Sequence, residues 1–429
     1  MFWIGVLAIA FGLVLSIALH EIGHLVPAKK FGVRVPQYFV GFGPTLWSVR
    51  RGETEYGIKA IPLGGFVRMV GMFPPAAQPG PLTRHRGPLG WARNVANDAR
   101  AASQEELIPG DDKRAFYQLT TPKKLAVMFG GPVVNLILSI ILFAVVFSVI
   151  GTPTRTNTIA TVVPCLDSAA EQECPADAPA TPAVDAGFAV GDQIISWDGV
   201  PVADWAGVAA AIQDGTTDPV TVQVLRDGDQ VSLTVTALLM ERPTVNEDGE
   251  SDVREIPYVG LAPTSVRTPQ PLSMTGEAIL MQFTGTIEVL GTLPQRLVSI
   301  AQTTFGGGER DPGVIGIIGV GRAAGELTEA AAPEGFLTQL QYILLVLASL
   351  NMALFVFNMI PLPPLDGGHI AGALYEGGRR QLARWRNRPN PGYADTAKLM
   401  PLTYAVVLIF LAMGLLLAIA DIFNPVDII

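Results

Sequence analysis

The sequence predicts a polytopic α-helical membrane protein with four transmembrane helices, a membrane-associated β-hairpin and one extracytoplasmic α+β domain. Of its 429 residues, 49% are hydrophobic and only 16% are charged, and the mean hydropathy is +0.38. This balance is expected when several segments face lipid rather than water. A helix crosses a bilayer core with about 20 apolar residues. Four uncharged apolar runs approach or exceed that length, at 2–19, 125–150, 342–365 and 402–420.

The first apolar run leads into the motif His20-Glu21-Ile22-Gly23-His24. On a helix, residues four apart project from one face, so His20 and His24 are placed to bind one Zn²⁺ while Glu21 reaches a metal-bound water. That arrangement is typical of metal-assisted peptide hydrolysis. Ionisable groups are costly at membrane depth, which favours a functional interpretation over a chance match of a short motif. We expect no cleaved signal peptide, because the start of the chain lacks Lys and Arg and the run ends in His-Glu.

Charge asymmetry predicts the orientation of the four spans. Residues 26–124 contain 15 Lys and Arg against 7 Asp and Glu, and residues 367–400 contain 6 against 2. Residues 151–340 have the opposite balance, with 8 basic against 25 acidic residues. Basic connections tend to stay in the cytoplasm. We therefore expect a multi-pass protein of the plasma membrane, with its first and third connections inside, its second outside and its active site near the cytoplasmic side.

The net charge of −9 is the sum of these opposed sides and gives no indication of nucleic-acid binding. Both cysteines, Cys165 and Cys174, lie in the second connection. An oxidising compartment there would permit a disulfide between them, and two free thiols are the alternative.

The first connection contains two short β-rich runs around the turn sequence at 62–65, which predict a hairpin over about 53–70. Its apolar flank indicates that it dips into the bilayer, where surrounding protein must bury irregular backbone. An edge strand at that depth would accept an extended substrate peptide by strand addition, and a plain cytoplasmic hairpin is the alternative. Residues 71–119 are polar and aperiodic except for helical spacing near 91–107, and we interpret them as a cytoplasmic insertion.

The second connection contains a compact module at 158–265. Gly-Asp and Asp-Gly turns separate its short strands, and one segment has helical spacing. Its segments 186–188 (AGF), 191–195 (GDQII) and 198–199 (DG) resemble a bacterial PDZ domain. Such domains bind peptides by adding a strand to a sheet, which implies a binding or gating role here. Residues 266–335 repeat apolar side chains at helical spacing and predict amphipathic helices at the membrane.

The two motif histidines require a further donor, because a catalytic zinc site has three protein ligands and one open position. Asp366 is the only acidic residue between Glu334 and Glu376, and it follows an apolar run that contains prolines. An Asp-Gly-Gly sequence is also common in turns. Its occurrence in the same chain as the His-Glu-x-x-His motif favours Asp366 as the third ligand.

These motifs, in this order and in these spans, resemble the site-2 protease family of intramembrane zinc metalloproteases. The resemblance covers nearly the whole chain and is strongest to the RseP type, in particular its single-PDZ members from actinobacteria. It implies that His20, His24 and Asp366 bind Zn²⁺ and that Glu21 is the general base.

Two further elements of that family bear on substrate. Its Gly-Pro-x-x-Asn element matches residues 131–135 and its third-span asparagine matches Asn358, so the resemblance implies that Asn135 and Asn358 bind substrate. The implied substrates are single-span membrane proteins in the lipid bilayer, such as trimmed anti-sigma factors or residual signal peptides. Substrate selection is expected to differ in detail, because only one PDZ-like module is present where some relatives carry two, and the insertion at 71–119 is long and polar.

Two other functions remain open. Intramembrane His, Glu and Asp also line ion pathways, so a zinc or ion transporter is one alternative, although its expected inverted repeat is lacking. A non-catalytic membrane scaffold that carries the PDZ-like module is the other.

His369 is interpreted as a residue that supports the metal ligands or has a structural role. The predicted segments are transmembrane helices at 1–28, 125–150, 336–370 and 401–424, the region 29–124 with its hairpin and insertion, the module at 158–265, the amphipathic region 266–335 and the cytoplasmic loop 371–400.

Overall fold

The computed structural model describes residues 1–75, 86–111, 113–166, 174, 178–245, 251–308, 310 and 313–426. The chain forms two compact units, one made of residues 1–149 and 271–429 and the other of residues 150–270. Within the described ranges, four helical segments are long and apolar enough to cross a membrane, which confirms the number of predicted spans. They are Phe2–Lys30, Thr121–Ile150, Phe336–Asn358 and Thr396–Phe423.

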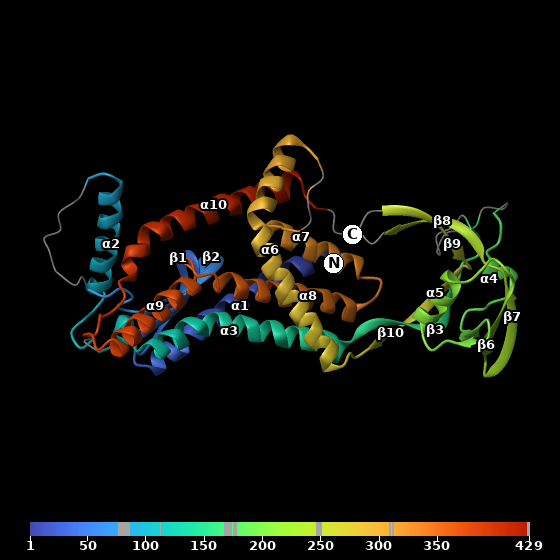
Figure 1. The fold of residues 1–429 in the computed structure, drawn as a ribbon, viewed down its shortest axis with the longest axis horizontal. Coiled ribbons are helices and arrows are strands. Elements are labelled where there is room, and N and C mark those ends of the chain that lie inside the picture. Colours follow the sequence, from blue (N-terminus) through green and yellow to red (C-terminus); the bar gives the residue numbers. More distant parts are fainter. Residues whose placement is uncertain are drawn as a thin grey trace. The chain divides into compact units, whose positions relative to one another are not determined.

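Helices α1 (Phe2–Lys30), α3 (Thr121–Ala144) and α8 (Phe336–Asn358) pack against one another in the first unit (Figure 1). A π-helical turn at Val145–Ile150 extends α3. Glycine allows α1 and α3 to approach closely, since a Cβ on Gly130 would overlap the carbonyl of Gly23. Close contacts of this kind hold helices together in lipid, where apolar burial alone does not favour association.

Strands β1 (Gln37–Arg51) and β2 (Thr54–Arg68) form an antiparallel sheet. Residues 37–40 pair with 55–58 on one side and with 65–68 on the other. The second half of β1 also pairs with the first half of β2, as in Arg51 opposite Thr54. The two long strands therefore bend into four short paired segments, and 65–68 form one edge of the sheet.

This arrangement differs from the predicted hairpin at 53–70. The two β-rich runs do not pair with each other but lie on either side of residues 37–40. The two runs still point in opposite directions, since the partners of 37–40 ascend along 55–58 and descend along 68–65. The chain therefore reverses between 58 and 65, where Gly64 has φ +124°, as well as at Gly52, whose φ is +62°. The glycines and proline at 37–44 do not fit a regular alternation, so the sequence by itself does not predict a strand there.

The insertion contains helix α2 (Pro88–Glu105) and a 3-10 turn, η1 (Phe116–Gln118), so the helix expected near 91–107 is confirmed. Residues 76–85 of the predicted insertion lie outside the described part of the chain. Asp111 ties the insertion to the segment between α1 and β1, since its carboxylate accepts a hydrogen bond of 2.7 Å from Arg34.

The predicted third span and third connection need correction. Helix α8 ends at Asn358, and a new helix, α9 (Asp366–Trp385), begins at the predicted third ligand. Prolines in the intervening segment remove backbone donors and end the first helix. The span therefore does not continue to residue 370, and the segment expected to be a loop at 371–400 is helical to Trp385. The chain continues through η3 (Thr396–Leu399) into α10 (Met400–Phe423).

Two further helices occupy the region predicted to be amphipathic, α6 (Leu272–Gly306) and α7 (Ile317–Ala330). Helix α7 packs on the first half of α1, where a Cβ on Gly5 would overlap Thr328. Helicity is thus confirmed for this region, and contact with the membrane surface stays a prediction.

The second unit is an α+β module. A central sheet has the order β10-β3-β4-β6-β7, and β5 pairs with β4. Its apolar core includes Ile159, Ile194, Trp197 and Val222. The strands and helices are β3 (Thr152–Val162), α4 (Pro182–Asp185), β4 (Gln193–Trp197), β5 (Val200–Pro201), α5 (Trp205–Gln213), β6 (Val220–Arg226), β7 (Asp229–Val235), β8 (Leu238–Val245), β9 (Ser251–Tyr258) and β10 (Leu261–Thr268).

The Gly-Asp turn of this module is fixed by an ion pair. The buried Asp192 carboxylate accepts two hydrogen bonds of 2.7 Å from Arg226. Burial opposes ionisation, but Arg226 and the backbone N–H of Ala189 outweigh it and keep the pKa of Asp192 below its usual value. The turn before β4 is thereby tied to the end of β6.

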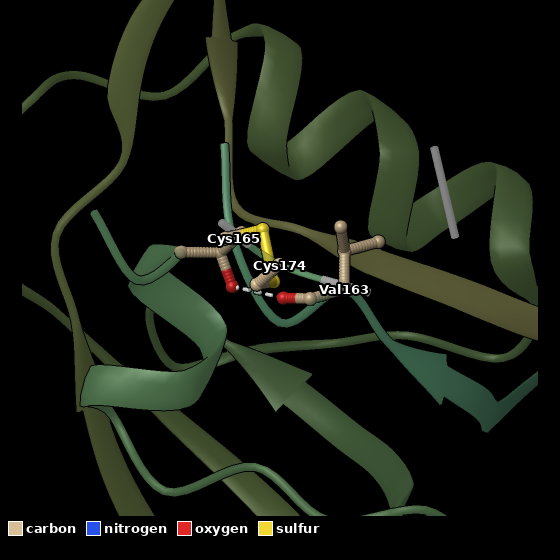
Figure 2. Close-up of a disulfide and its surroundings, with 4 residues drawn as sticks. Val163, Cys165 and Cys174 are labelled. Atoms are coloured by element: carbon tan, nitrogen blue, oxygen red, sulfur yellow. Dashed lines mark hydrogen bonds between the residues drawn. A yellow bond between two sulfur atoms is a disulfide. The ribbon is translucent and has the colours of Figure 1, made fainter. Parts of the chain in front are cut away.

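Cys165 and Cys174 form a disulfide in the second unit (Figure 2). Cys165 also pairs with Ala180 in an isolated β-bridge. Of the two alternatives left by the sequence, the bridged form is the one present. The residues between 167 and 173, inside the closed loop, are outside the described ranges.

Candidate metal centre

Three donor atoms from two distant parts of the chain meet at one point. His20 and His24 lie one turn apart on α1, and their Nε2 atoms are 3.2 Å from each other. Oδ2 of Asp366, in the first turn of α9, is 3.3 Å from each of these nitrogens. Within the described residues, this trio is the set of His, Cys, Asp and Glu side chains that could hold a metal ion.

The spacing of these atoms fits zinc. Zinc bonds to nitrogen and oxygen are about 2.0–2.1 Å long, so two ligands of a tetrahedral ion lie about 3.3–3.4 Å apart. The three separations of 3.2–3.3 Å match that value on all three sides. Asp366 Oδ2 is also buried without a hydrogen-bond donor, as expected for a metal-binding oxygen.

The protonation states of the donors are consistent with metal binding. Nδ1 of His24 donates a hydrogen bond of 2.8 Å to the carbonyl of Val127, which leaves Nε2 free as the ligand atom. Burial opposes ionisation of Asp366, but the two neighbouring imidazoles outweigh it and hold the pKa of its carboxyl below the usual range. Asp366 is therefore a carboxylate at neutral pH.

Glycine at position 131 keeps the metal position open. A Cβ on Gly131 would lie 2.6 Å from His20 Nε2 and still closer to His24 Nε2. Helix α3 thus forms one wall of the site although it supplies none of the three donors. Gly131 begins the Gly-Pro-x-x-Asn element noted in the sequence, but its place beside the metal position was not predicted, and the Gly130-Gly131 pair within an apolar span was the available signal.

A tight fold of the backbone positions the third donor. Gly367 and Gly368 lie against the segment between α8 and α9, and a Cβ on Gly368 would be 2.6 Å from the backbone nitrogen of Pro363. Because Asp366 is in the first turn of α9, the helix dipole also favours its negative charge. The Asp-Gly-Gly sequence therefore combines a candidate donor with the two small residues that bring it to α1.

Glu21 and the three donors line one cavity of about 320 Å³. The sheet reaches the same cavity through Phe66 and Val67. Gly65 permits this approach, since a Cβ there would be 2.9 Å from Cγ of Glu21. The remaining lining residues are Met69, Met72, Met128, Asn358, Pro364 and His369.

The other predicted site residues have different positions. Asn358 lines the cavity, in keeping with the expected contact to substrate. Asn135 is only 1% exposed and does not line it, so direct substrate contact by Asn135 gains no support. His369 faces the cavity but is not in the donor trio, and burial lowers its pKa, so its imidazole is neutral at pH 7.

Comparison with known proteins matches this geometry to a family. The sequence model of Peptidase family M50 matches residues 8–399. The chain belongs to this family. Zinc metalloprotease Rip1 of Mycolicibacterium smegmatis is 33% identical, covering 100% of this chain and 99% of that protein. Rip1 of Mycobacterium tuberculosis is 31% identical with 99% of each covered, and Metalloprotease MmpA of Caulobacter vibrioides is 29% identical with 87% of each covered.

Membership of the M50 family decides between the functions that the sequence left open. The chain is an intramembrane zinc metalloprotease of the site-2 type, and its four apolar helices are those of a multi-pass membrane protein. The ion-transporter and scaffold alternatives are not favoured. Zinc is the expected cofactor, in agreement with the donor geometry.

Replacement of Gly131 tests whether α3 shapes the metal position. We expect Gly131→Ala to weaken zinc binding by roughly 100-fold or more, because the added methyl group crowds both histidine Nε2 atoms. Zinc affinity is measured by competition with a chelator. Gly378→Ala is the matched control, since its added Cβ meets nothing within 4 Å. Unchanged zinc affinity in Gly131→Ala would show that the metal does not lie beside α3.

Proposed function

We propose that this M50 peptidase hydrolyses a peptide bond in the 320 Å³ cavity, with zinc held by His20, His24 and Asp366 and with Glu21 as the general base. The observation that carries the proposal is the triangle of donor atoms with 3.2–3.3 Å sides next to a glutamate in the same cavity. Zinc, when bound, supplies Lewis acidity that acidifies water and polarises a carbonyl group.

The protein side chains supply the remaining catalytic and supporting roles. Glu21 takes a proton from the attacking water and returns it to the leaving amine, which is a common role for a carboxylate beside a zinc site. Asn358 lines the same cavity and offers an amide N–H to the substrate carbonyl oxygen. The neutral imidazole of His369 lies at the cavity wall, where it supports the carboxylate ligand one turn earlier on α9.

The sheet is suited to present the substrate in an extended form. A helical peptide bond is protected by its own hydrogen bonds, so a transmembrane substrate must unwind before it is cut. Residues 65–68 of β2 pair with β1 on one side only among the described strands, and Phe66 and Val67 line the cavity. Addition of the unwound substrate to this edge would hold its backbone beside Glu21.

The substrate class follows from the depth of the site. His20 and His24 lie within a candidate span, so the scissile bond belongs to a membrane-embedded segment. Single-span proteins such as trimmed anti-sigma factors or residual signal peptides fit this requirement. The basic balance of residues 26–124 and 367–400 supports a cytoplasmic opening of the site, with the module at 150–270 outside.

Replacement of the general base is the experiment that tests this function. We expect Glu21→Gln to bind zinc with unchanged affinity but to cleave a single-span reporter about 10²–10⁴ times more slowly. Glu288→Gln on α6 is the control for loss of one carboxylate, and it should retain full activity. Cleavage by purified Glu21→Gln at the wild-type rate would rule out Glu21 as the base.

The extracytoplasmic module is proposed to act as a PDZ-like size filter. Thr152 of β3 pairs with Thr268 of β10, so the two ends of the module are adjacent and a short glycine linker can replace residues 153–267. We expect this excision to leave zinc binding intact and to permit cleavage of a substrate with an untrimmed ectodomain, measured beside the trimmed form. A zinc-bound, membrane-inserted variant that cuts neither form would show that the module engages substrate instead.

A further inference from the structure

The end of α9 farthest from the metal combines basic and aromatic side chains on an exposed surface. Five of the ten residues 379–388 are arginines. Between residues 367 and 394 the only acidic residue is Glu376. On the exposed side of the same helix, Tyr375 is 63% exposed, Leu382 44% and Trp385 75%. We call residues 375–388 the basic end of α9.

The single acidic residue does not neutralise this charge. Glu376 is 2% exposed, and its two oxygens each accept a hydrogen bond of 2.9 Å from Lys124. It also pairs with Arg380 at 2.9 Å. Arg384, Arg386 and Arg388 are exposed, and no carboxylate is within 4.0 Å of them among the residues whose placement is described.

Packing places the basic end beyond the end of a span. Gly377 lies against Thr121, the first residue of the candidate span Thr121–Ile150, with 3.2 Å from its ideal Cβ position to the threonine Oγ1. Residues 378–388 therefore continue past the start of α3. The end of α1 at this side carries Lys29 and Lys30 in its last turn. This is the level at which lipid headgroups surround a membrane protein.

We propose that the basic end of α9 binds anionic phospholipid headgroups and thereby holds the helix that carries Asp366. Guanidinium groups bind phosphate oxygens in a bidentate manner, and Trp and Tyr favour the boundary between headgroups and acyl chains. A basic cluster directly beside a transmembrane helix is attracted to anionic leaflets. One anionic phospholipid therefore offers phosphate oxygens to the arginines and acyl chains to the exposed apolar side chains.

The connection to the metal is mechanical. Helix α9 runs without a break from Asp366 to Trp385, and the buried contact between Lys124 and Glu376 clamps its middle to α3. A headgroup bound at the basic end restricts the motion of α9, and the same helix carries the third zinc ligand at its other end. Anionic lipid is therefore expected to slow the loss of zinc.

The test measures zinc release to a chelator from the full-length protein in nanodiscs. Discs of phosphatidylcholine alone are compared with discs that contain about one third phosphatidylglycerol. We expect zinc release from the wild type to be at least several-fold slower with phosphatidylglycerol, and this difference to shrink as salt is raised. The combined variant Arg384→Gln, Arg386→Gln and Arg388→Gln should release zinc at one rate in both discs.

A control with the same charge change separates this site from general electrostatics. The combined variant Arg50→Gln, Arg51→Gln and Lys398→Gln removes three positive charges outside α9 and should keep the phosphatidylglycerol response. Quenching of Trp385 by brominated phosphatidylglycerol, taken as the difference from Trp385→Phe, measures headgroup proximity without any metal readout.

Three results would overturn the proposal. One is equal zinc release by the wild type in the two discs. Another is a full phosphatidylglycerol response in the α9 variant, with Trp385 remaining unquenched. The third is slowing of zinc release by soluble oligo-glutamate but not by phosphatidylglycerol, which would identify the surface as a binding site for acidic peptides.

Discussion

The structure depends on bringing three polar donors to within about 3.3 Å of one another inside an apolar helix bundle. Two of them, on α1, are brought together by helical spacing alone, because residues four apart share a face. The third comes from 342 residues further along the chain and requires one helix to end at Asn358 and another to begin at Asp366. Glycine makes both approaches possible, at Gly131 beside the histidines and at Gly367 and Gly368 behind Asp366.

Burial of ionisable groups in such a bundle is unfavourable unless each has a partner. The candidate metal centre satisfies this condition through the mutual contacts of its three donors and through the hydrogen bond from His24 to Val127. A second buried pair, Lys124 with Glu376, lies nearby between α3 and α9 and keeps the two helices in register. Together these contacts fix α9 at its start and its middle. The helices around the charged site are thus held together by paired polar groups as well as by apolar packing.

Much of this arrangement could be predicted from the sequence, because its strongest signals are local. Long apolar runs gave the four spans, and the His-Glu-x-x-His spacing predicted two ligands on one helix face. The parts that were wrong depend on tertiary contacts. Residues 37–40 lie at the centre of the sheet because two distant segments of β2 pair with them. Helix α9 replaces an expected loop because its buried face packs on α3.

The most direct test of the account is X-ray absorption at the zinc edge of the purified protein. We predict one zinc per chain, with nitrogen and oxygen neighbours at about 2.0–2.1 Å and outer scattering from two imidazoles. Asp366→Ala should lose zinc or exchange its carboxylate oxygen for solvent, whereas His369→Ala should leave the spectrum unchanged. A sulfur neighbour at about 2.3 Å, or a third imidazole that disappears in His369→Ala, would contradict the assignment of the three ligands.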